Sequence, residues 1–251
     1  MPQNIAIIGG TGFERLPVDI YSEQLIVSTE FGDVIVQSLS DNYTEPSKLF
    51  FLSRHGAAHH IAPHSINHRA NITALKQLDV QYIMASNAVG SLCRDWAPGT
   101  LVTPHDFIDF GTTSPVTLFG DHSWSHSDFT EPYDHMLRAA IHRSAEELSV
   151  SVIPAAVYLC CRGPRFETPA EIRMFKIWGA DIIGMTGAPE AIYAREAGMN
   201  YAALAVVTNL AAGLTAGPVS HEDVGVVMKQ WLPVVRHILI QAASHAVQQL
   251  G

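Results

Sequence analysis

The sequence predicts an α/β fold in which a central β-sheet is flanked by helices. Short apolar runs of strand length alternate with amphipathic, helix-like segments along the chain. Residues 179–209 form the clearest unit, because two apolar runs bracket a tight turn and a short helical segment. A composition of 47% hydrophobic and 16% charged residues is typical of a globular protein and not of a disordered one.

Length, charge and cysteine usage narrow the class further. A chain of 251 residues without an evident linker or repeat predicts one domain, spanning residues 1–251. The net charge of −9 argues against nucleic acid or an anionic membrane as a partner, so an anionic substrate would need a local cluster of donors. No apolar run approaches the length of a membrane span, the first residues carry no basic secretory segment, and the three cysteines make no disulfide framework. These features predict a cytoplasmic protein.

The first predicted strand, residues 4–8, runs into a glycine turn at residues 9–12. The amides of such a turn, with the Thr11 hydroxyl, could hold an anion, and an ordinary tight turn is the alternative. A dinucleotide fingerprint would need a third glycine where Arg15 stands, and no Gly-Lys-Ser/Thr follows. A nicotinamide-dependent enzyme and a P-loop are therefore disfavoured.

Strands are also predicted over residues 33–39 and 48–53, and the second runs into Arg54 and His55. A guanidinium offers a planar fork of donors to phosphate oxygens, and the histidine can add one more donor. Charge at the end of a buried strand is costly without a partner, so a bound anion is one interpretation and a surface ion pair the other. Histidines recur at spacings of four after this pair, but Pro63 interrupts the helix that a metal site would need, so we expect no metal.

The middle of the chain continues the alternation of strands and helices. The predicted elements are a helix over 67–78, a strand over 80–85, a sharp turn over 86–92, a strand over 101–110, a polar irregular segment over 111–131, a helix over 132–148 and a strand over 152–159. Small residues in the sharp turn let a backbone approach a ligand closely. An irregular segment as long as 111–131 is usually functional or lies at an interface.

Caps and turns organise the last third of the chain. Thr168 and Glu171 predict a capping box at the start of one helix. Pro189 is predicted at the first position of the next helix, and Gly198 just beyond its end. Ser220 is predicted to cap the last helix, with Asp223 completing a second capping box.

Several strands end in polar residues. The apolar run 180–184 leads into Thr186, and the run 202–207 ends in Thr208 and Asn209. In open α/β sheets ligands bind beyond the carboxyl ends of the strands, so these residues mark a candidate site. An ordinary strand–helix–strand unit with polar loop ends is the alternative.

Three groups of motifs, in the same order, resemble those of the trimeric purine nucleoside phosphorylases. They are GGTGF at residues 9–13, GMTGAPEA with AREAG and VTN between residues 184 and 209, and SHEDV at residues 220–224. The resemblance spans nearly the whole chain and is greatest to the subfamily of methylthioadenosine and methylthioinosine phosphorylases. It implies a nucleoside phosphorylase fold with a central mixed sheet, a homotrimer, and phosphorolysis with phosphate as co-substrate and no other cofactor.

The resemblance also implies roles for individual residues. Phosphate would be bound by Thr11, Arg54, His55, Asn87, Ala88 and Thr186. The purine nucleoside would be bound by Phe166, Glu167, Met185, Asn209, Leu210, Ala211, His221 and His126. The catalytic candidates are Asn209, His55 and Glu167. Phosphate would attack C1′ and stabilise an oxocarbenium-like sugar while Asn209 donates to N7 of the leaving purine.

Two departures from the methylthioadenosine phosphorylases concern the base site. Those enzymes carry aspartates in the base-recognising loop and a small polar residue at the position of Glu167, whereas this chain has Asn209 and Ala211 in the loop. A carboxylate accepts a hydrogen bond from N1–H, which 6-oxopurines have and adenine lacks. Leaving it unpaired costs about 1–3 kcal/mol or more, and such sites can discriminate by ~10⁴. The sequence therefore predicts inosine, guanosine or S-methyl-5′-thioinosine as substrate.

The 5′ group and the assembly are predicted from two further similarities. His221 resembles the histidine that bonds a 5′-hydroxyl in inosine-cleaving relatives, which favours inosine and guanosine. Segment 111–131 resembles a loop that reaches a neighbouring subunit, with His126 near the 5′ end of the sugar. The alternatives are a methylthioadenosine phosphorylase, a hydrolytic nucleosidase, which would have no use for Arg54 and His55, and a nucleoside-binding protein without turnover.

Overall fold

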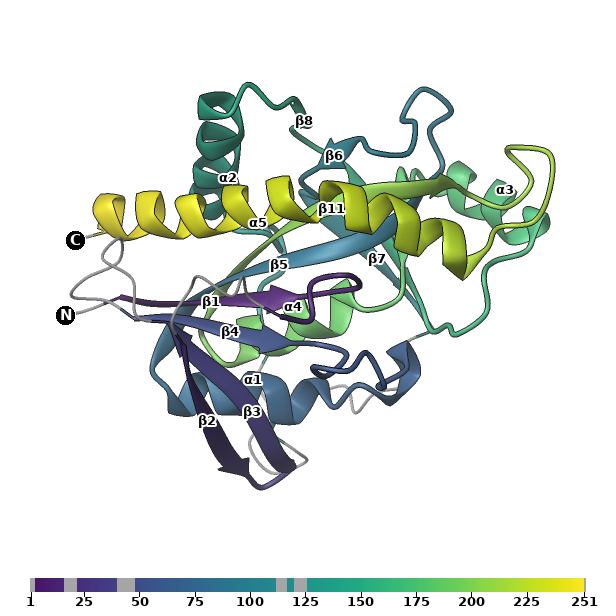
Figure 1. The fold of residues 1–251 in the computed structure, drawn as a ribbon. Helices are drawn as coiled ribbons and strands as arrows, with labels where there is room; N and C mark the ends of the chain where they lie inside the picture. Colours follow the sequence, from purple (N-terminus) through teal and green to yellow (C-terminus); the bar gives the residue numbers. More distant parts are fainter. Residues whose placement is uncertain (1–2, 16–21, 40–47, 112–116, 120–125, 251) are drawn as a thin grey trace.

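A mixed sheet of eleven strands forms the centre of the protein in the computed structural model (Figure 1). The structure describes residues 3–15, 22–39, 48–111, 117–119 and 126–250. Most strands lie in the order β2-β3-β4-β1-β5-β10-β9-β7, while β11 pairs with β5 and β6, and β6 with β8. The strands are β1 (Asn4–Gly9), β2 (Ser22–Thr29), β3 (Gly32–Leu39), β4 (Leu49–Ser53), β5 (Val80–Ser91), β6 (Leu101–Val102), β7 (Asp106–Phe110), β8 (Val152–Ile153), β9 (Val157–Cys161), β10 (Ile182–Gly184) and β11 (Asn200–Leu210).

Helices cover both faces of this sheet (Figure 1). Helices α2 (His135–Glu147) and α5 (His221–Leu250) cover one face, and α1 (His68–Gln77) and α4 (Gly187–Glu196) cover the other. The remaining helices are α3 (Pro169–Ile177) and the 3₁₀ helix η1 (Pro63–Ser65). In the described part of the chain, none of these helices is both long and apolar enough to cross a bilayer.

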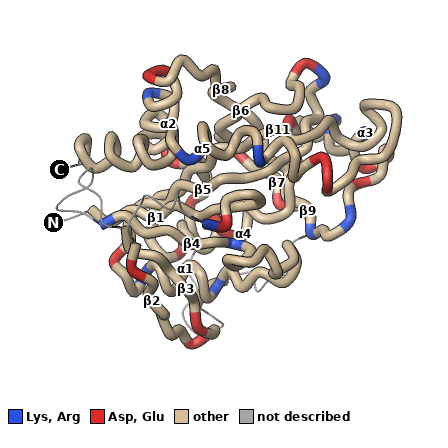
Figure 2. Tube along the Cα trace, viewed as in Figure 1, with Lys and Arg blue, Asp and Glu red and all other residues tan. Residues whose placement is uncertain are grey.

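The central strands are apolar on both faces because both faces are covered. On β1, Ile5 and Ile7 belong to the core beneath α2 and α5, whereas Ala6 and Ile8 belong to the core beneath α1 and α4. Strands β1, β5 and β11 contain no Lys, Arg, Asp or Glu, so they are tan throughout in Figure 2. The predicted α/β class and mixed sheet are confirmed.

The sheet forks at the carboxyl end of β5. One edge of β5 pairs with β11 from Tyr82 to Ser91. The other edge pairs with β1 as far as Ala85, and with β10 only from Gly90 onward. Within the described pairings, residues 86–89 therefore have no strand beside them on that edge. The gap lies where β1 and β4 both end, and it positions the candidate site.

Three predicted elements were wrong in their boundaries. Residues 86–92 do not turn sharply, because β5 continues to Ser91 alongside β11. The predicted strands 101–110 and 152–159 are each divided, into β6 and β7 and into β8 and β9. The breaks contain Pro104 and Pro154, and proline has no N–H to donate to a strand ladder.

The cap predictions were partly confirmed. Thr168 and Glu171 form the predicted capping box at α3, and Gly198 follows α4 with a φ of 78°. Helix α4 begins at Gly187, so Pro189 occupies its third position and not its first. At α5, the hydroxyl oxygen of Ser220 accepts from the Asp223 amide and its hydrogen is donated to the Asp223 carboxylate, which differs from the reciprocal box that was predicted.

The segment predicted to be irregular, 111–131, is described only in part. Residues 112–116 and 120–125 lie outside the described residues. Residues 117–119 and 126–131 contain neither helix nor strand, as predicted. Helix α2 then begins at His135, three residues later than the predicted start, because the Asp134 side chain accepts from the Leu137 amide and caps the helix.

Candidate active site

A cavity of about 410 Å³ opens at the fork of the sheet. Its size suits a small organic ligand. The predicted site residues that line it are Thr11, Arg54, His55, Ala88, Phe166, Glu167, Met185, Thr186, Asn209, Ala211 and His221. These residues come from seven separate stretches of the chain, so the fold brings together most of what the sequence singled out.

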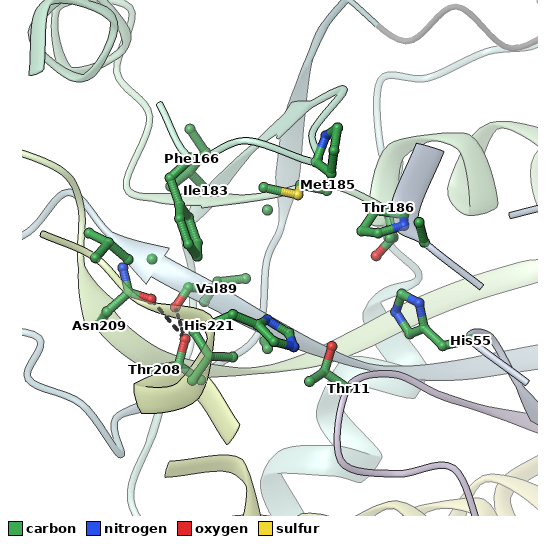
Figure 3. A pocket seen from close by; sticks show the side chains of 18 of the residues that line it. Thr11, His55, Val89, Phe166, Ile183, Met185, Thr186, Thr208, Asn209 and His221 are labelled. Carbon is green, nitrogen blue, oxygen red and sulfur yellow. Dashed lines mark hydrogen bonds between the residues drawn. The ribbon is translucent and has the colours of Figure 1, made fainter. Parts of the chain in front are cut away.

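The lining divides into two ends, which Figure 3 shows from close by. The polar end contains Thr11, His55 and Thr186. The opposite end contains Phe166 and Asn209, with an apolar wall that includes Ile183. We call these the anion end and the ring end, after the groups that such side chains bind.

Arg54 lies at the anion end and is 1% exposed. Its Nε donates to Glu190 Oε1 at 2.5 Å and its Nη2 to Glu190 Oε2 at 2.7 Å, while Nη1 donates to the Ser86 carbonyl at 2.8 Å. A guanidinium has five N–H groups, so Nη1 and Nη2 each keep one that these bonds do not use. The ion pair expected as one alternative therefore exists, but it is buried and not at the surface.

His55 is a neutral acceptor in this environment. Its Nδ1 lies 2.8 Å from the Ile61 carbonyl, which can only accept, so Nδ1 carries the proton. Burial, together with the nearby positive charge of Arg54, lowers the pKa of His55 to about 4. The neutral ring thus leaves Nε2 as an acceptor, which corrects the donor role that the sequence suggested. A phosphate that carries a P–OH hydrogen supplies the matching donor.

The glycine turn offers fewer amides than predicted. The Gly10 amide donates to Ser86 Oγ at 2.9 Å, and the Gly12 amide donates to the Glu14 carboxylate at 2.8 Å. These two donors are therefore committed within the protein. Thr11 itself lines the cavity and presents its hydroxyl at the anion end (Figure 3).

Thr186 and the start of α4 complete the anion end. The Thr186 hydroxyl accepts from Asn87 Nδ2 at 3.3 Å, so Asn87 lies behind Thr186 and is not itself part of the lining. Ala88 does line the cavity, from the unpaired edge of β5. Because N–H and C=O groups of alternate residues point to the same edge of a strand, the Ala88 amide faces the same side as the Ser86 carbonyl that receives Arg54.

Glu167 supplies a carboxylate at the ring end, next to Phe166. Burial raises its pKa, and the Cys161 thiol donates a hydrogen bond to it. The residues just after it start α3, where the Thr168–Glu171 box fixes the backbone. A partly desolvated carboxylate beside an aromatic ring is suited to an N–H donor on a flat heterocycle.

Asn209 is held in one orientation by its neighbours. Its Oδ1 accepts from the Thr208 hydroxyl at 2.9 Å, and its Nδ2 donates to the Leu210 carbonyl at 3.0 Å. One N–H of Nδ2 is not used by that bond and is available to a ligand. Leu210 does not line the cavity and contributes its backbone only.

His221 lies between the two ends, beside Thr11 (Figure 3). It is the first residue of α5 and is exposed to solvent, and it also lines the cavity. Its ring is 6.0 Å from that of His59, which is 4.8 Å from that of His55. His126 is exposed and does not belong to the lining of this cavity.

Sequence reasoning missed several residues of the site. His59 and His60 line the cavity, and Glu190, outside the lining, accepts hydrogen bonds from Arg54. The two histidines belong to the segment that was considered for metal binding, so their clustering was a usable signal. Within the described residues no three or more His, Cys, Asp or Glu side chains are grouped as metal ligands.

Comparison with known proteins identifies the family of this fold and cavity. The family model described as Phosphorylase superfamily matches residues 4–244. This chain belongs to the phosphorylase superfamily. The fold and the motif resemblance predicted from the sequence are both confirmed by this membership.

Relatives within the superfamily act on purine nucleosides, by their names. The 6-oxopurine nucleoside phosphorylase of Pyrococcus furiosus is 42% identical over 92% of this chain and 88% of its own length. A protein of Methanothermobacter thermautotrophicus named "Probable S-methyl-5'-thioinosine phosphorylase" is 41% identical over 90% of this chain and 78% of its own length. An adenosine/methylthioadenosine phosphorylase of Schistosoma mansoni, solved with adenine as a double mutant, is 29% identical, with a TM-score of 0.89 over 97% of this chain and 92% of that one.

Proposed function

We propose that this phosphorylase cleaves 6-oxopurine nucleosides with phosphate and releases the free purine and a ribose 1-phosphate. The observation that carries the proposal is the pairing of two ends in one cavity, with Glu167 and Asn209 at one and Arg54 and His55 at the other. The names of the relatives support phosphorolysis of purine nucleosides. Neither end alone would distinguish this reaction from simple binding.

The proposed reaction assigns each end a chemical task. A phosphate oxygen attacks C1′ of the sugar as the bond between C1′ and N9 breaks, and its electron pair passes into the purine. The free N–H of Asn209 Nδ2 donates to N7 and stabilises the charge that develops on the ring. At the anion end, the free N–H groups of Arg54 and the Thr11 and Thr186 hydroxyls face the phosphate, while His55 Nε2 accepts its P–OH hydrogen.

Glu167 supports a 6-oxopurine over adenine. Its carboxylate accepts from N1–H of hypoxanthine or guanine, whereas N1 of adenine is itself an acceptor. A buried carboxylate facing another acceptor loses its partner, at a cost of about 1–3 kcal/mol or more. The relative from Schistosoma mansoni acts on adenosine and methylthioadenosine by its name, and we propose Glu167 as the residue that gives this chain the other specificity.

The proposal for the 5′ group of the sugar rests on His221. We propose that its imidazole bonds a 5′-hydroxyl, which favours inosine and guanosine. S-methyl-5′-thioinosine is the second candidate substrate, supported by the relative from Methanothermobacter thermautotrophicus. We further propose a cytoplasmic homotrimer that uses no cofactor besides phosphate, in which His126 reaches the cavity of a neighbouring subunit.

The test is a comparison of five nucleosides with saturating phosphate. Initial rates are measured for inosine, guanosine, S-methyl-5′-thioinosine, adenosine and methylthioadenosine. We expect kcat/KM for inosine to exceed that for adenosine by ~10² or more, because of the bond that Glu167 makes. Equal turnover of adenosine and inosine would contradict the assigned role of Glu167.

The Glu167→Gln variant is the matched control for this comparison. A carboxamide can turn its NH₂ toward N1 of adenine, so the preference for inosine should shrink while the phosphate requirement stays the same. A variant that keeps the wild-type preference would show that the purine is read elsewhere.

A further inference from the structure

The buried partner of Arg54 is the feature that extends the proposed function. Glu190 lies on α4 and is 0% exposed. Its two carboxylate oxygens accept hydrogen bonds from Nε and Nη2 of Arg54, which makes a bidentate ion pair. The two residues are 136 positions apart in sequence. Glu190 does not line the cavity, so it is not placed to touch a ligand there.

One further buried group bonds Glu190, and another lies near it. The Tyr201 hydroxyl, from β11, donates to Glu190 Oε2 at 3.0 Å. His68 Nδ1, from α1, lies 3.8 Å from Glu190 Oε1. Arg54 after β4, Tyr201 on β11 and His68 on α1 thus surround this carboxylate, which has no contact with solvent.

The geometry fixes which part of Arg54 can meet an anion. Glu190 accepts hydrogen bonds from Nε and Nη2, and the Ser86 carbonyl accepts one from Nη1. What is left for the cavity is one N–H on each terminal nitrogen. Because the pair carries no net charge, these directed donors, and not an excess of positive charge, would bind the anion.

We propose that Glu190 is a positioning residue for phosphate, which holds the Arg54 guanidinium so that its two remaining N–H groups face the cavity. The inference rests on the proposed function, since it names a determinant of phosphate binding in the same site. The arginine side chain is long and flexible, so the guanidinium would otherwise sample several orientations. In a displaced orientation it could not donate two hydrogen bonds to phosphate oxygens at once.

The experiment measures KM for phosphate and KM for inosine separately in Glu190→Gln and Tyr201→Phe. Glutamine keeps the shape of Glu190 but offers only one acceptor oxygen, and its NH₂ opposes an Arg54 donor. We expect the KM for phosphate to rise about tenfold or more in Glu190→Gln, and about threefold in Tyr201→Phe, which removes one of the hydrogen bonds to the carboxylate and leaves both bonds to Arg54 in place. The KM for inosine at saturating phosphate should change by less than about twofold, because the ring end is not altered.

Tyr133→Phe is the matched control. Tyr133 is buried, and its ring is 5.9 Å from that of Tyr201, but it makes no hydrogen bond to Glu190 in the described structure. This variant should keep both KM values within about twofold of the wild type, because it removes none of the described hydrogen bonds to Glu190 or Arg54. It separates a general loosening of the core from a specific effect on phosphate.

The outcomes decide the proposal in each case. A folded Glu190→Gln enzyme with a wild-type KM for phosphate would overturn it, as would a parallel rise in both KM values. If removal of the buried charge prevents Glu190→Gln from folding, Tyr201→Phe decides alone, and an unchanged KM for phosphate there overturns the proposal. If the wild-type enzyme cleaves inosine without phosphate, the proposed function itself has failed, which is a different result.

Discussion

The His221 imidazole lies between the anion end and the ring end of the cavity, and we propose that it faces the 5′ carbon of a bound nucleoside. Imidazole can donate to or accept from a hydroxyl, whereas a thioether sulfur is only a weak acceptor. One neutral hydrogen bond contributes about 0.5–1.5 kcal/mol. We therefore expect only a modest preference for a 5′-hydroxyl at this residue.

His221→Met tests this residue. The thioether side chain removes the bond to a 5′-hydroxyl and offers an apolar contact to a methylthio group. We expect the ratio of kcat/KM for S-methyl-5′-thioinosine to that for inosine to rise about tenfold. An unchanged ratio, or a wild-type enzyme that already favours S-methyl-5′-thioinosine strongly, would mean that His221 does not read the 5′ position.

Single residues of the site could be predicted, but their partners could not. The sequence singled out Arg54 because a charge at the end of a buried strand needs a partner, and the structure supplies Glu190. That partner is 136 residues away, so only the packing of α4 against the sheet brings the two together. For the same reason, the tautomer of His55 depends on the Ile61 carbonyl in a loop, which no local pattern predicts.

Helices α1 and α4 meet at a buried ionisable cluster, which couples this face of the sheet to pH. His68 opens α1, is 5% exposed, and lies near Glu190 of α4. Burial lowers the pKa of His68 to about 4, and that of His55 to about 4 as well. Both values lie below the usual 6.5, so the unfolded chain takes up these protons first as the pH falls.

The free energy of unfolding should therefore fall with acidification. The loss begins near pH 6.5 and is complete near pH 4, and each histidine contributes about 1 kcal/mol per pH unit in between. Denaturant unfolding of wild type and His68→Gln at pH 6.5, 5.5 and 4.5 measures this. The slope with pH should be smaller by about that amount in the variant, and equal slopes would contradict the assignment of a buried neutral His68.

Elements were predicted well where local pattern decides and poorly where pairing decides. Apolar runs located β1, β3 and β4 to within one residue, and cap chemistry located the start of α3. The continuation of β5 to Ser91 was missed because its small residues look like a turn, while pairing with β11 keeps them extended. The prolines that divide β6 from β7 and β8 from β9 were visible in the sequence but were given too little weight.

At the scale of the whole molecule, exposed apolar groups gather at one edge of the sheet. Strand β7 ends the sheet, and at its end the half-exposed ring of Phe110 lies 5.5 Å from that of Trp178, which follows α3. Ile177, the last residue of α3, is 84% exposed. Exposed apolar groups that gather in this way are typical of interaction surfaces. Phe110 directly precedes in sequence the segment 111–131, which we predict to reach a neighbouring subunit.

We expect a homotrimer in solution. Sedimentation equilibrium at several protein concentrations, run alongside activity at the same concentrations, measures the assembly. Activity should follow the trimer, because His126 is proposed to act in the cavity of a neighbouring subunit. A monomer that keeps full activity on dilution would contradict this assembly.

That residues 1–251 form a single domain also stays a prediction, which one cooperative unfolding transition would support.

The most direct test of phosphorolysis is the identity of the sugar product from inosine. Purified enzyme is incubated with inosine, with and without inorganic phosphate, and the sugar is identified by phosphorus NMR while hypoxanthine is quantified. The anion end of the cavity predicts one ribose 1-phosphate for each hypoxanthine, and no cleavage without phosphate. Release of hypoxanthine with free ribose, at a rate that does not depend on phosphate, would contradict the account and indicate a hydrolase.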